Sequence, residues 1–377
     1  MSADIITDVG YWLRPNLSFH FTHLVDRPLR IAIDAMGGDF APASEIAGAI
    51  AASTHFQGST PVEFVFVGDE ALIRAEISKH LGSVNGSANA SGFTYTILHT
   101  TEVITMKDEP ATALRTKRDS SIVRGMHLHK EGGVDAFLSA GNTGAVMSAG
   151  TLILGRIRGV TRPTIASFFP TVRNQPTLVV DVGANVDCKP RFLYEFGVMG
   201  SIYVREVLGI AHPRVALLNV GEEESKGNSL VLEALSMMRD SSALNFVGNT
   251  EGRDILMGSV DVVVCDGFTG NIVLKFAESF VTLLRTKLKD FAARSIFNKL
   301  SVAVMIPTLR RVLKEFDYQE YGGVPLLGVN GVVIIGHGKS SPLAIKNMII
   351  RAVEVIEKDV NRRIEDALES IQQKEST

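Results

Sequence analysis

The chain has 377 residues, of which 38 are Lys or Arg and 41 are Asp or Glu, so its formal net charge is −3. This length fits one large α/β unit or two domains of roughly 150 residues, and the charge argues against a nucleic-acid binder, which is usually clearly basic. The two cysteines, Cys188 and Cys265, exclude a disulfide framework and a cysteine-rich zinc site. No signal-peptide pattern and no apolar run long enough to span a bilayer are evident, so we expect a cytoplasmic protein.

Short apolar runs alternate with helical patterns from residue 31 onward. Strands are predicted at residues 31–34, 62–67, 94–99, 136–139, 165–169, 178–181, 215–219, 260–266 and 332–335. Helices are predicted at residues 191–208, 230–238, 272–293 and 343–371. Several strands are continuous Val/Ile/Leu runs, which are typical of strands buried on both faces. The alternation predicts an α/β fold of three layers, in which helices cover both faces of a mostly parallel sheet.

The chain is predicted to contain one large α/β domain at residues 30–377, preceded by an N-terminal extension of unknown role at residues 1–29. The small polar stretch at residues 85–92 is expected to be a surface loop.

A separate helical segment is predicted at residues 295–320, where it would project from the domain. Apolar residues come first, and Arg310, Arg311 and Lys314 follow them, which suits a helix lying on an anionic membrane surface. Pro307 is expected to break the segment into two short helices. A dimer contact or a hairpin in the core explains the same pattern equally well.

Six predicted strands end in loops that combine glycine with Asn, Thr, Ser or Lys. These loops are residues 35–39, 140–145, 182–187, 220–228, 267–271 and 336–341. Glycine lets the backbone approach a ligand closely, and the helix N-termini that follow attract anions. In open parallel sheets ligands bind beyond the carboxyl ends of the strands, so the six loops predict a phosphate or other oxyanion site at one common edge. Any single loop of this kind is more often only a tight turn.

Familiar catalytic fingerprints are missing from the sequence. We find no GxGxxG, no GxxxxGK[ST] and no GxSxG motif, and no His/Cys spacing that indicates a metal. Cys188 is the better thiol nucleophile candidate because Lys189 follows it, but no histidine partner is evident. Cys265 lies in an apolar run and is expected to be a buried structural thiol.

Charged residues at strand ends have two possible explanations. Asp34, Asp181 and Asp266 each end a predicted strand, where a functional role and capping of the next turn are equally good interpretations. Lys226 stands in a glycine-flanked loop after three glutamates. A lysine at that edge could neutralise a bound phosphate, although most exposed lysines have no such role.

The motifs, taken in order, resemble those of the PlsX-type phosphate acyltransferases: IAIDAMGGDFAP (31–42), GNTGA (141–145), DVGANVD (181–187), LLNVGEEESKGN (217–228), GNTEG (248–252), DGFTGN (266–271) and YGGVPLLGVNG (321–331). The resemblance implies a homodimer with the α/β/α architecture of phosphotransacetylases and isocitrate-dehydrogenase-like proteins. It implies transfer of a long-chain acyl group from acyl carrier protein to inorganic phosphate. We expect no cofactor, and the sequence leaves open whether a metal ion assists. The acyl phosphate would then supply a membrane glycerol-3-phosphate acyltransferase in phospholipid synthesis.

The motif match also implies roles for individual residues. Lys226 and Asn271 are the expected catalytic pair: our hypothesis is that Lys226 neutralises phosphate or the developing oxyanion, and that Asn271 donates a hydrogen bond at its helix start. Candidate phosphate or pantetheine contacts are Asp34, Gly37, Gly38, Asn142, Thr143, Gly144, Asn185 and His337. Because phosphate is already an anionic nucleophile, we expect direct attack without a covalent acyl-enzyme.

Two surfaces are candidates for partner contacts. Arg115, Lys117 and Arg118 form a basic cluster that could steer an acidic carrier protein, although a solvated helix face explains the cluster slightly better. Ile296, Phe297 and Leu300 are the candidate membrane contacts, in line with the peripheral membrane association that the resemblance implies.

Three other functions remain open from the sequence. They are a short-chain phosphate acetyl- or butyryltransferase that uses coenzyme A thioesters, a dehydrogenase of the isocitrate type, and a non-catalytic membrane scaffold.

Overall fold

The computed structural model describes residues 27–81, 93–173, 175–313 and 318–375. The predicted loop at residues 85–92, Lys314, and residues 1–26 of the predicted extension lie outside these ranges. One eleven-stranded sheet forms the centre of the molecule, in the order β3-β2-β1-β4-β11-β10-β5-β6-β9-β7-β8. The strands are β1 (Leu29–Asp34), β2 (Val62–Gly68), β3 (Thr94–His99), β4 (Ala136–Ser139), β5 (Thr164–Phe169), β6 (Thr177–Val180), β7 (Arg214–Leu218), β8 (Asn245–Thr250), β9 (Val262–Val264), β10 (Val324–Leu327) and β11 (Val332–Ile335).

Two sets of parallel strands make up this sheet. Strands β3, β2, β1, β4 and β11 run in one direction, and β6, β9, β7 and β8 form the second set. Between the sets, β10 is antiparallel to β11 and to β5, and β5 is antiparallel to β6. These three reversals make the two sets antiparallel to each other. The sheet is mostly parallel, as predicted, but the prediction that all six glycine loops share one edge is wrong.

The central strands are apolar because each side of the sheet has its own core. Ile31 and Ile33 of β1 belong to one hydrophobic cluster, and Ala32 between them belongs to the other. In β9, Val262 and Val264 belong to the first cluster, and Val263 belongs to the second. Successive side chains of a strand point to opposite faces, so a continuous apolar run fills both cores. This division confirms the three-layer prediction.

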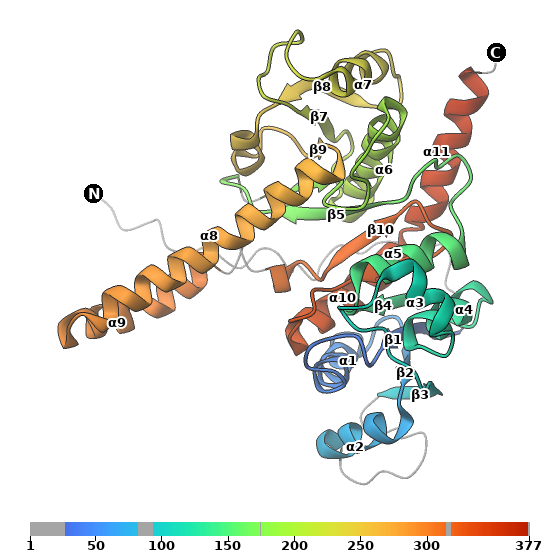
Figure 1. The fold of residues 1–377 in the computed structure, drawn as a ribbon, viewed down its shortest axis with the longest axis vertical. Helices are drawn as coiled ribbons and strands as arrows, with labels where there is room; N and C mark the ends of the chain where they lie inside the picture. Colours follow the sequence, from blue (N-terminus) through green and yellow to red (C-terminus); the bar gives the residue numbers. More distant parts are fainter. Residues whose placement is uncertain (1–26, 82–92, 174, 314–317, 376–377) are drawn as a thin grey trace.

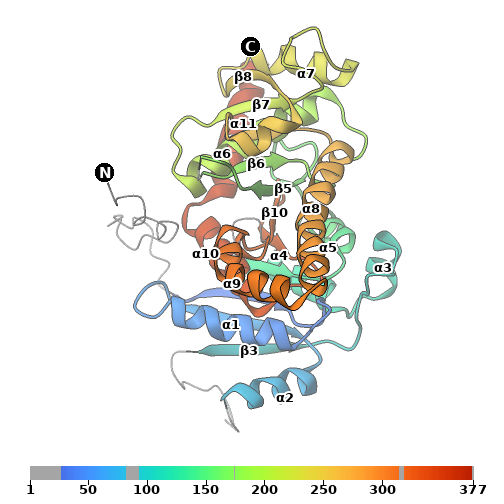
Figure 2. The same cartoon turned by 90° about the vertical axis from the view of Figure 1, so that its left-hand side faces the viewer.

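The helices divide between the two faces in the same manner. The first core receives side chains from α1 (Ala43–His55), α2 (Glu70–Leu81), α6 (Pro190–Leu208), α7 (Ser229–Arg239), α10 (Pro342–Glu357) and α11 (Val360–Glu375). The second core receives side chains from α3 (Pro110–Thr116), α4 (Ser121–Lys130), α5 (Thr143–Ala149) and α8 (Gly267–Ala293). Strand β3 and helix α2 lie at one end of the molecule, and β8 and α7 lie at the other (Figure 2).

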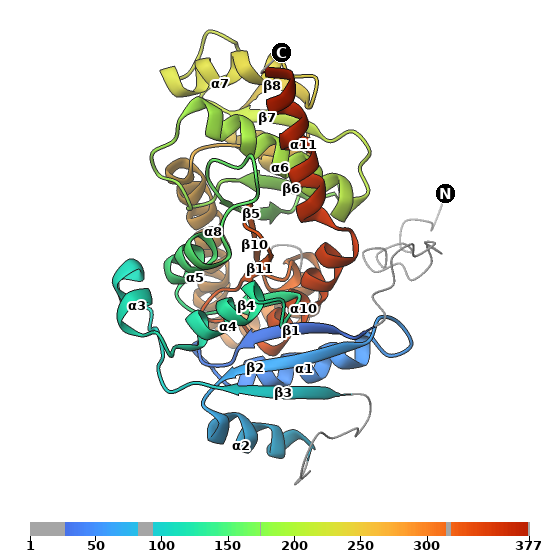
Figure 3. The same cartoon turned by 90° about the vertical axis from the view of Figure 1, so that its right-hand side faces the viewer.

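Two expectations about the elements are wrong, and two strands were missed. The predicted helix at residues 343–371 is two helices, because Asp359 adopts a left-handed conformation (φ 50°) that ends the helical run. Helix α11 then runs alongside α6 (Figure 3). Strands β8 and β10 were not predicted, since β8 is polar and β10 has four residues with Pro325 among them. Pro307 lies inside one continuous helix, α9 (Ile296–Leu313), since a proline removes only one backbone donor and need not end a helix.

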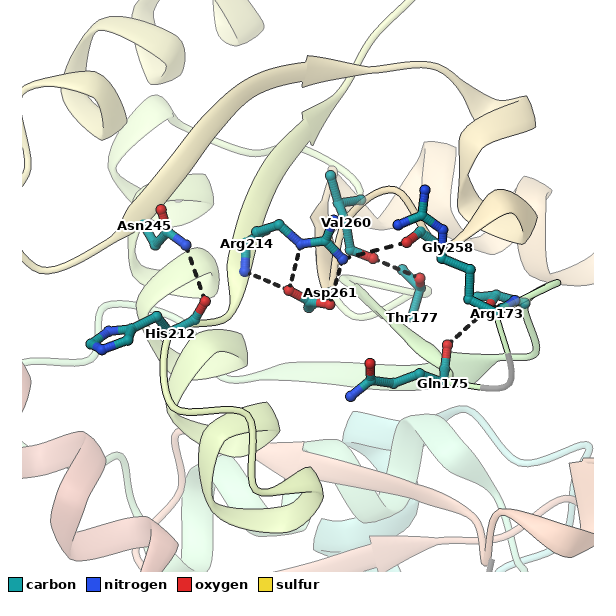
Figure 4. Close-up of polar contacts among 10 residues, drawn as sticks. Arg173, Gln175, Thr177, His212, Arg214, Asn245, Gly258, Val260 and Asp261 are labelled. Carbon is teal, nitrogen blue, oxygen red and sulfur yellow. Dashed lines mark hydrogen bonds and ion pairs between the residues drawn. The ribbon is translucent and has the colours of Figure 1, made fainter. Parts of the chain in front are cut away.

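Hydrogen bonds and an ion pair connect the amino ends of strands in the second parallel set (Figure 4). We call this group of contacts, made by Thr177, Arg214, Val260 and Asp261, the polar clamp. The guanidinium of Arg214 donates to both carboxylate oxygens of Asp261, at 2.9 and 3.0 Å, and the Arg214 backbone N–H donates to Asp261 at 2.7 Å. These contacts raise the pKa of Arg214. The Thr177 hydroxyl donates to the carbonyl oxygen of Val260 at 2.8 Å. The clamp therefore fixes β6, β7 and β9 at the edge opposite their glycine loops.

Helices α8 and α9 form a hairpin that extends away from the sheet (Figure 1). Large apolar side chains on this hairpin face solvent, and Phe297 is 77% exposed. The predicted membrane contacts Ile296 and Leu300 are exposed as well. Across the described residues, no helix is both long and apolar enough to cross a bilayer.

Candidate functional site

Three glycine loops follow neighbouring parallel strands of the second set. Residues 181–187 follow β6, residues 265–271 follow β9, and residues 219–228 follow β7. Strand β9 lies between β6 and β7 and is parallel to both, so the three loops share one edge of the sheet. We call them the Lys226 loops. The other three glycine loops, at residues 35–39, 140–145 and 336–341, follow β1, β4 and β11, and we call them the Asp34 loops.

The carboxylate of Asp181 organises the first of the Lys226 loops. Its oxygens accept hydrogen bonds from the backbone N–H groups of Gly183 (2.9 Å), Ala184 (2.6 Å) and Asn185 (2.8 Å), and from the side-chain amide of Asn185 (2.8 Å). Burial raises the pKa of Asp181, and these donors oppose that shift. The Asn185 amide also donates to the carbonyl oxygen of Pro163 at 2.8 Å. Both side chains therefore bind the protein's own backbone and fix the loop.

Helix α8 places Asn271 against this loop. Asp266 caps the helix by accepting from the Thr269 backbone N–H at 2.8 Å, so the capping interpretation of Asp266 is confirmed. The Gly267 N–H donates to the carbonyl oxygen of Asn185 at 2.7 Å, and a Cβ atom at Gly183 would lie 3.4 Å from Cγ of Asn271. Asn271 is exposed, and its side chain has no hydrogen-bond partner among the described residues. The N–H groups of its side-chain amide are therefore available at the loop surface to donate to a ligand.

Lys226 projects from the loop that follows β7. The Asn219 amide donates to the Lys226 carbonyl oxygen at 3.0 Å, and the Lys226 N–H donates to Glu223 at 3.1 Å. Gly227 has φ of 106°, which a residue with a Cβ atom rarely adopts. The backbone is thereby fixed, while the Lys226 side chain is exposed and its ammonium has no ion-pair partner in the part of the chain that the structure describes. A lysine held in this way can bind an anion.

The Asp34 loops meet around a second buried carboxyl group. Asp34 accepts from the Ser139 hydroxyl at 2.6 Å and from the Met36 backbone N–H at 3.1 Å, and Ser139 accepts from the Gly141 N–H at 3.0 Å. A Cβ atom at Gly37 would lie 2.8 Å from the backbone nitrogen of Gly141, so only glycine allows the loops to pack this closely. Burial raises the pKa of Asp34.

The remaining predicted contacts lie in the same loops. Asn142 caps α5 by accepting from Ala145 (3.1 Å), and its amide donates to two backbone carbonyl oxygens of residues 105 and 108. Thr143 is exposed at the first residue of α5. Gly144 lies against Pro110, and His337 accepts from the Lys339 N–H at 3.1 Å. The structure thus gathers the predicted residues into two loop groups rather than one.

Both cysteines are poor nucleophiles. Burial, together with the negative charge of Asp181, raises the pKa of the Cys188 thiol to about 12, so the thiolate that a nucleophile needs is scarce at neutral pH. Burial also raises the pKa of Cys265 well above its ordinary value. Within the described ranges, no group of three or more His, Cys, Asp or Glu side chains could hold a metal ion.

The basic cluster is only partly available to a partner. Lys117 donates to the Asp108 carboxylate at 2.7 Å, and this contact, together with hydrogen bonds from Thr105, lowers the pKa of Asp108 to about 2. Arg115 and Arg118 are exposed, and the Arg118 Nε donates to the Arg115 carbonyl oxygen at 3.3 Å. Two of the three predicted cations therefore present their charge to solvent.

Glu45 is an unexpected member of the Asp34 region. It lies in the first turn of α1, is 1% exposed, and neither side-chain oxygen has a hydrogen-bond partner from another described residue. A Cβ atom at Gly38 would lie 2.6 Å from its Oε1. Burial and the negative charge of Asp34 raise the pKa of Glu45 to about 8. The sequence signal was weak: a single acidic residue in a helix of mostly small and apolar residues.

Comparisons of the sequence with known proteins show which family the chain belongs to. The sequence profile of the family described as "Fatty acid synthesis protein" matches residues 29–363. A phosphate acyltransferase from Heliobacterium modesticaldum is 49% identical over 321 residues, which cover 85% of this chain and 92% of the relative. One from Halothermothrix orenii is 47% identical over 333 residues, which cover 88% and 96% of the two chains. The chain belongs to the PlsX-type phosphate acyltransferase family.

Solved structures confirm the architecture. A phosphotransacetylase from Streptococcus pyogenes aligns with a TM-score of 0.57 at 17% identity, covering 88% of this chain and 94% of that one. The EutD phosphotransacetylase from Staphylococcus aureus aligns with a TM-score of 0.54 at 16% identity over the same shares. The expected three-layer fold of phosphotransacetylase type is therefore confirmed.

The raised pKa of Glu45 predicts a pH-dependent stability. The folded protein keeps this proton up to about pH 8, whereas the unfolded chain releases it near 4.5, so the stability that neutral Glu45 contributes is complete below pH 4.5 and is lost as the pH rises toward 8. Denaturant unfolding should be measured between pH 5 and 8. The free energy of unfolding of wild type should fall more steeply with pH than that of Glu45→Gln, and the two slopes should differ by up to about 1 kcal/mol per pH unit. The exposed Glu131→Gln is the control; equal slopes for all three proteins would contradict the assignment.

Proposed function

We propose that the protein transfers a long-chain acyl group from acyl carrier protein to inorganic phosphate, forming acyl phosphate for phospholipid synthesis. One observation supports the proposal most directly: neighbouring strands bring the ammonium of Lys226 and the amide of Asn271, neither of which has a partner among the described residues, to the same edge of the sheet. Phosphate needs positive charge and hydrogen-bond donors rather than an activated side-chain nucleophile. The family membership supplies the reaction type, and the donor and the chain length are the proposed part.

The proposed reaction is a direct displacement. An oxygen of HPO₄²⁻ forms a bond to the thioester carbonyl carbon, and the carbonyl oxygen carries the negative charge of the tetrahedral intermediate. Collapse breaks the carbon–sulfur bond, and the phosphate proton passes to the leaving thiolate. Lys226 offsets the charge of phosphate, and the Asn271 amide donates to the developing oxyanion. The raised pKa of Cys188 agrees with a route that has no acyl-enzyme.

A short-chain reaction with coenzyme A thioesters is the second candidate. The phosphotransacetylases that share the fold make it worth testing, although similarity at that identity concerns the fold alone. Comparing acyl carrier protein with coenzyme A as donors, with hydroxylamine trapping of acyl phosphate, separates the two.

Two surfaces would serve the proposed partners. Arg115 and Arg118 are the proposed contact for the acidic carrier protein. The exposed apolar face of α9 is the proposed contact with an anionic membrane, where the product would reach a glycerol-3-phosphate acyltransferase. The apolar face of α8, which exposes Ile272, Phe276 and Phe280, is available for a homodimer contact.

Substitution of the catalytic pair should lower turnover while leaving the fold intact. Lys226→Ala and Asn271→Ala should each reduce kcat for acyl-phosphate formation by about 10²–10³-fold, because each removes one group that stabilises developing charge. Lys130→Ala, an exposed lysine on α4, is the matched control. Near-wild-type turnover of either variant, with an unchanged circular dichroism spectrum, would remove that residue from the catalytic role.

Charge reversal should weaken carrier-protein docking. We expect Arg115→Glu combined with Arg118→Glu to raise KM for acyl carrier protein about 3- to 10-fold at low salt, with KM for phosphate unchanged, because docking charges act on encounter. Arg362→Glu on α11 is a charge-reversal control. An unchanged KM for the carrier would mean that the two arginines are only a solvated helix face.

Membrane contact should depend on the tip of α9. Ile296→Glu combined with Leu300→Glu should abolish co-sedimentation with anionic phosphatidylglycerol vesicles and leave activity in solution unchanged, because charge cannot enter the apolar layer cheaply. Leu72→Glu, an exposed leucine on α2, controls for added charge. If the double variant still sediments but elutes as a monomer, the face belongs to a dimer contact instead.

A further inference from the structure

Arg162 stands at the edge of the sheet that carries the Lys226 loops. It immediately precedes Pro163 and β5, and β5 is antiparallel to β6, with Ala166 opposite Val180. The pairing continues through the Val182 N–H, which donates to the Ile165 carbonyl oxygen at 3.1 Å. The amino end of β5 therefore lies beside the carboxyl end of β6. Arg162 reaches the site because β5 runs antiparallel to β6.

The backbone on both sides of Arg162 is fixed. The carbonyl oxygen of Pro163 accepts from the Asn185 amide at 2.8 Å. Thr161 donates to the buried carboxylate of Glu195 from its backbone N–H and from its hydroxyl, each at 2.8 Å. Asn185 belongs to the loop that contacts α8 and Asn271, so the backbone next to Arg162 is hydrogen-bonded directly to the candidate site. A rigid backbone positions a binding group with little entropic cost.

The guanidinium of Arg162 differs from those of its neighbours in the same connection. Arg158 pairs with Glu369 at 3.0 Å, and Arg156 donates to the Thr161 carbonyl oxygen. Arg162 is exposed and has its Cζ atom 5.9 Å from the centroid of the Phe192 ring, and no carboxylate pairs with it among the described residues. A guanidinium over an aromatic ring keeps its N–H groups directed outward in one plane.

We propose that Arg162 binds the phosphate acceptor, together with Lys226. This inference rests on the proposed function, in which phosphate is the substrate. Arg162 and Lys226 flank the site, since β5 and β7 are separated by β6 and β9, a span of about 14 Å at the usual strand spacing. Two long cationic side chains can converge on one anion across that distance. HPO₄²⁻ carries two negative charges, and Lys226 alone offsets one of them.

The chemistry of the guanidinium suits this role. Its planar fork can donate to two phosphate oxygens at once, which leaves another oxygen of the same phosphate directed toward the thioester. A lysine at this position would supply charge without the fork, so the two contributions can be separated by substitution.

Steady-state kinetics of the full-length enzyme test the proposal. Arg162→Gln should raise KM for inorganic phosphate at least tenfold and leave KM for the acyl donor unchanged. Arg162→Lys should show a smaller rise. Arg158→Gln, from the same connection, is the matched control and should behave as wild type. An unchanged KM for phosphate in Arg162→Gln, or a rise in KM for the acyl donor alone, would overturn the proposal.

A binding measurement separates this proposal from the proposed function. Inorganic phosphate should protect Arg162 of the wild-type protein from phenylglyoxal, with modification mapped by mass spectrometry, and Arg158 should stay unprotected. Titration calorimetry with phosphate should show weaker binding to Arg162→Gln. If wild type forms no acyl phosphate from any thioester, the proposed function fails, yet these measurements still decide whether Arg162 binds phosphate. Equal modification of Arg162 with and without phosphate would overturn the inference.

Discussion

The buried carboxylate of Asp181 is the interaction on which the candidate site depends. It collects three backbone N–H groups and one side-chain amide from residues 183–185, and through Asn185 it is connected to both β5 and α8. An unsatisfied charge at such depth would be strongly unfavourable, so the loop must close around it. The surfaces that present Asn271 and Arg162 are consequences of that closure. Of the two interpretations open from the sequence, a functional role or capping of the next turn, the hydrogen bonds of Asp181 fit the second.

In the proposed reaction the site acts by electrostatics rather than through a reactive side chain. Its thiols are held protonated by burial, and its exposed donors are an ammonium, an amide and a guanidinium. Such a set stabilises negative charge as it develops and needs no reorganisation during the reaction. This division of labour fits a substrate that brings its own nucleophilic oxygen. It also explains why a sequence without catalytic fingerprints can encode an enzyme.

The sequence predicted the strands well because their burial on both faces leaves continuous apolar runs, as in residues 62–67 and 332–335. It could not predict the break at Asp359, because the apolar stripe of α10 continues in register through Val360, Ile364 and Leu368. The opposed directions of the two strand sets depend on β10, where Pro325 interrupts a short apolar run and hides the strand. Lys226 and Asn271 came from motif resemblance, whereas Arg162 was missed because its place depends on antiparallel pairing.

The position of β11 in the sheet has a consequence for how the chain matures. Residues 332–335 lie between β4 and β10, so the two strand sets join only after the ribosome has released most of the polypeptide. Until then β4 and β5 are open edges, which are templates for pairing with other chains. Long-range closure of this kind is slow. Nascent or truncated chains that end before β11 would therefore depend on chaperones to keep two half-sheets apart.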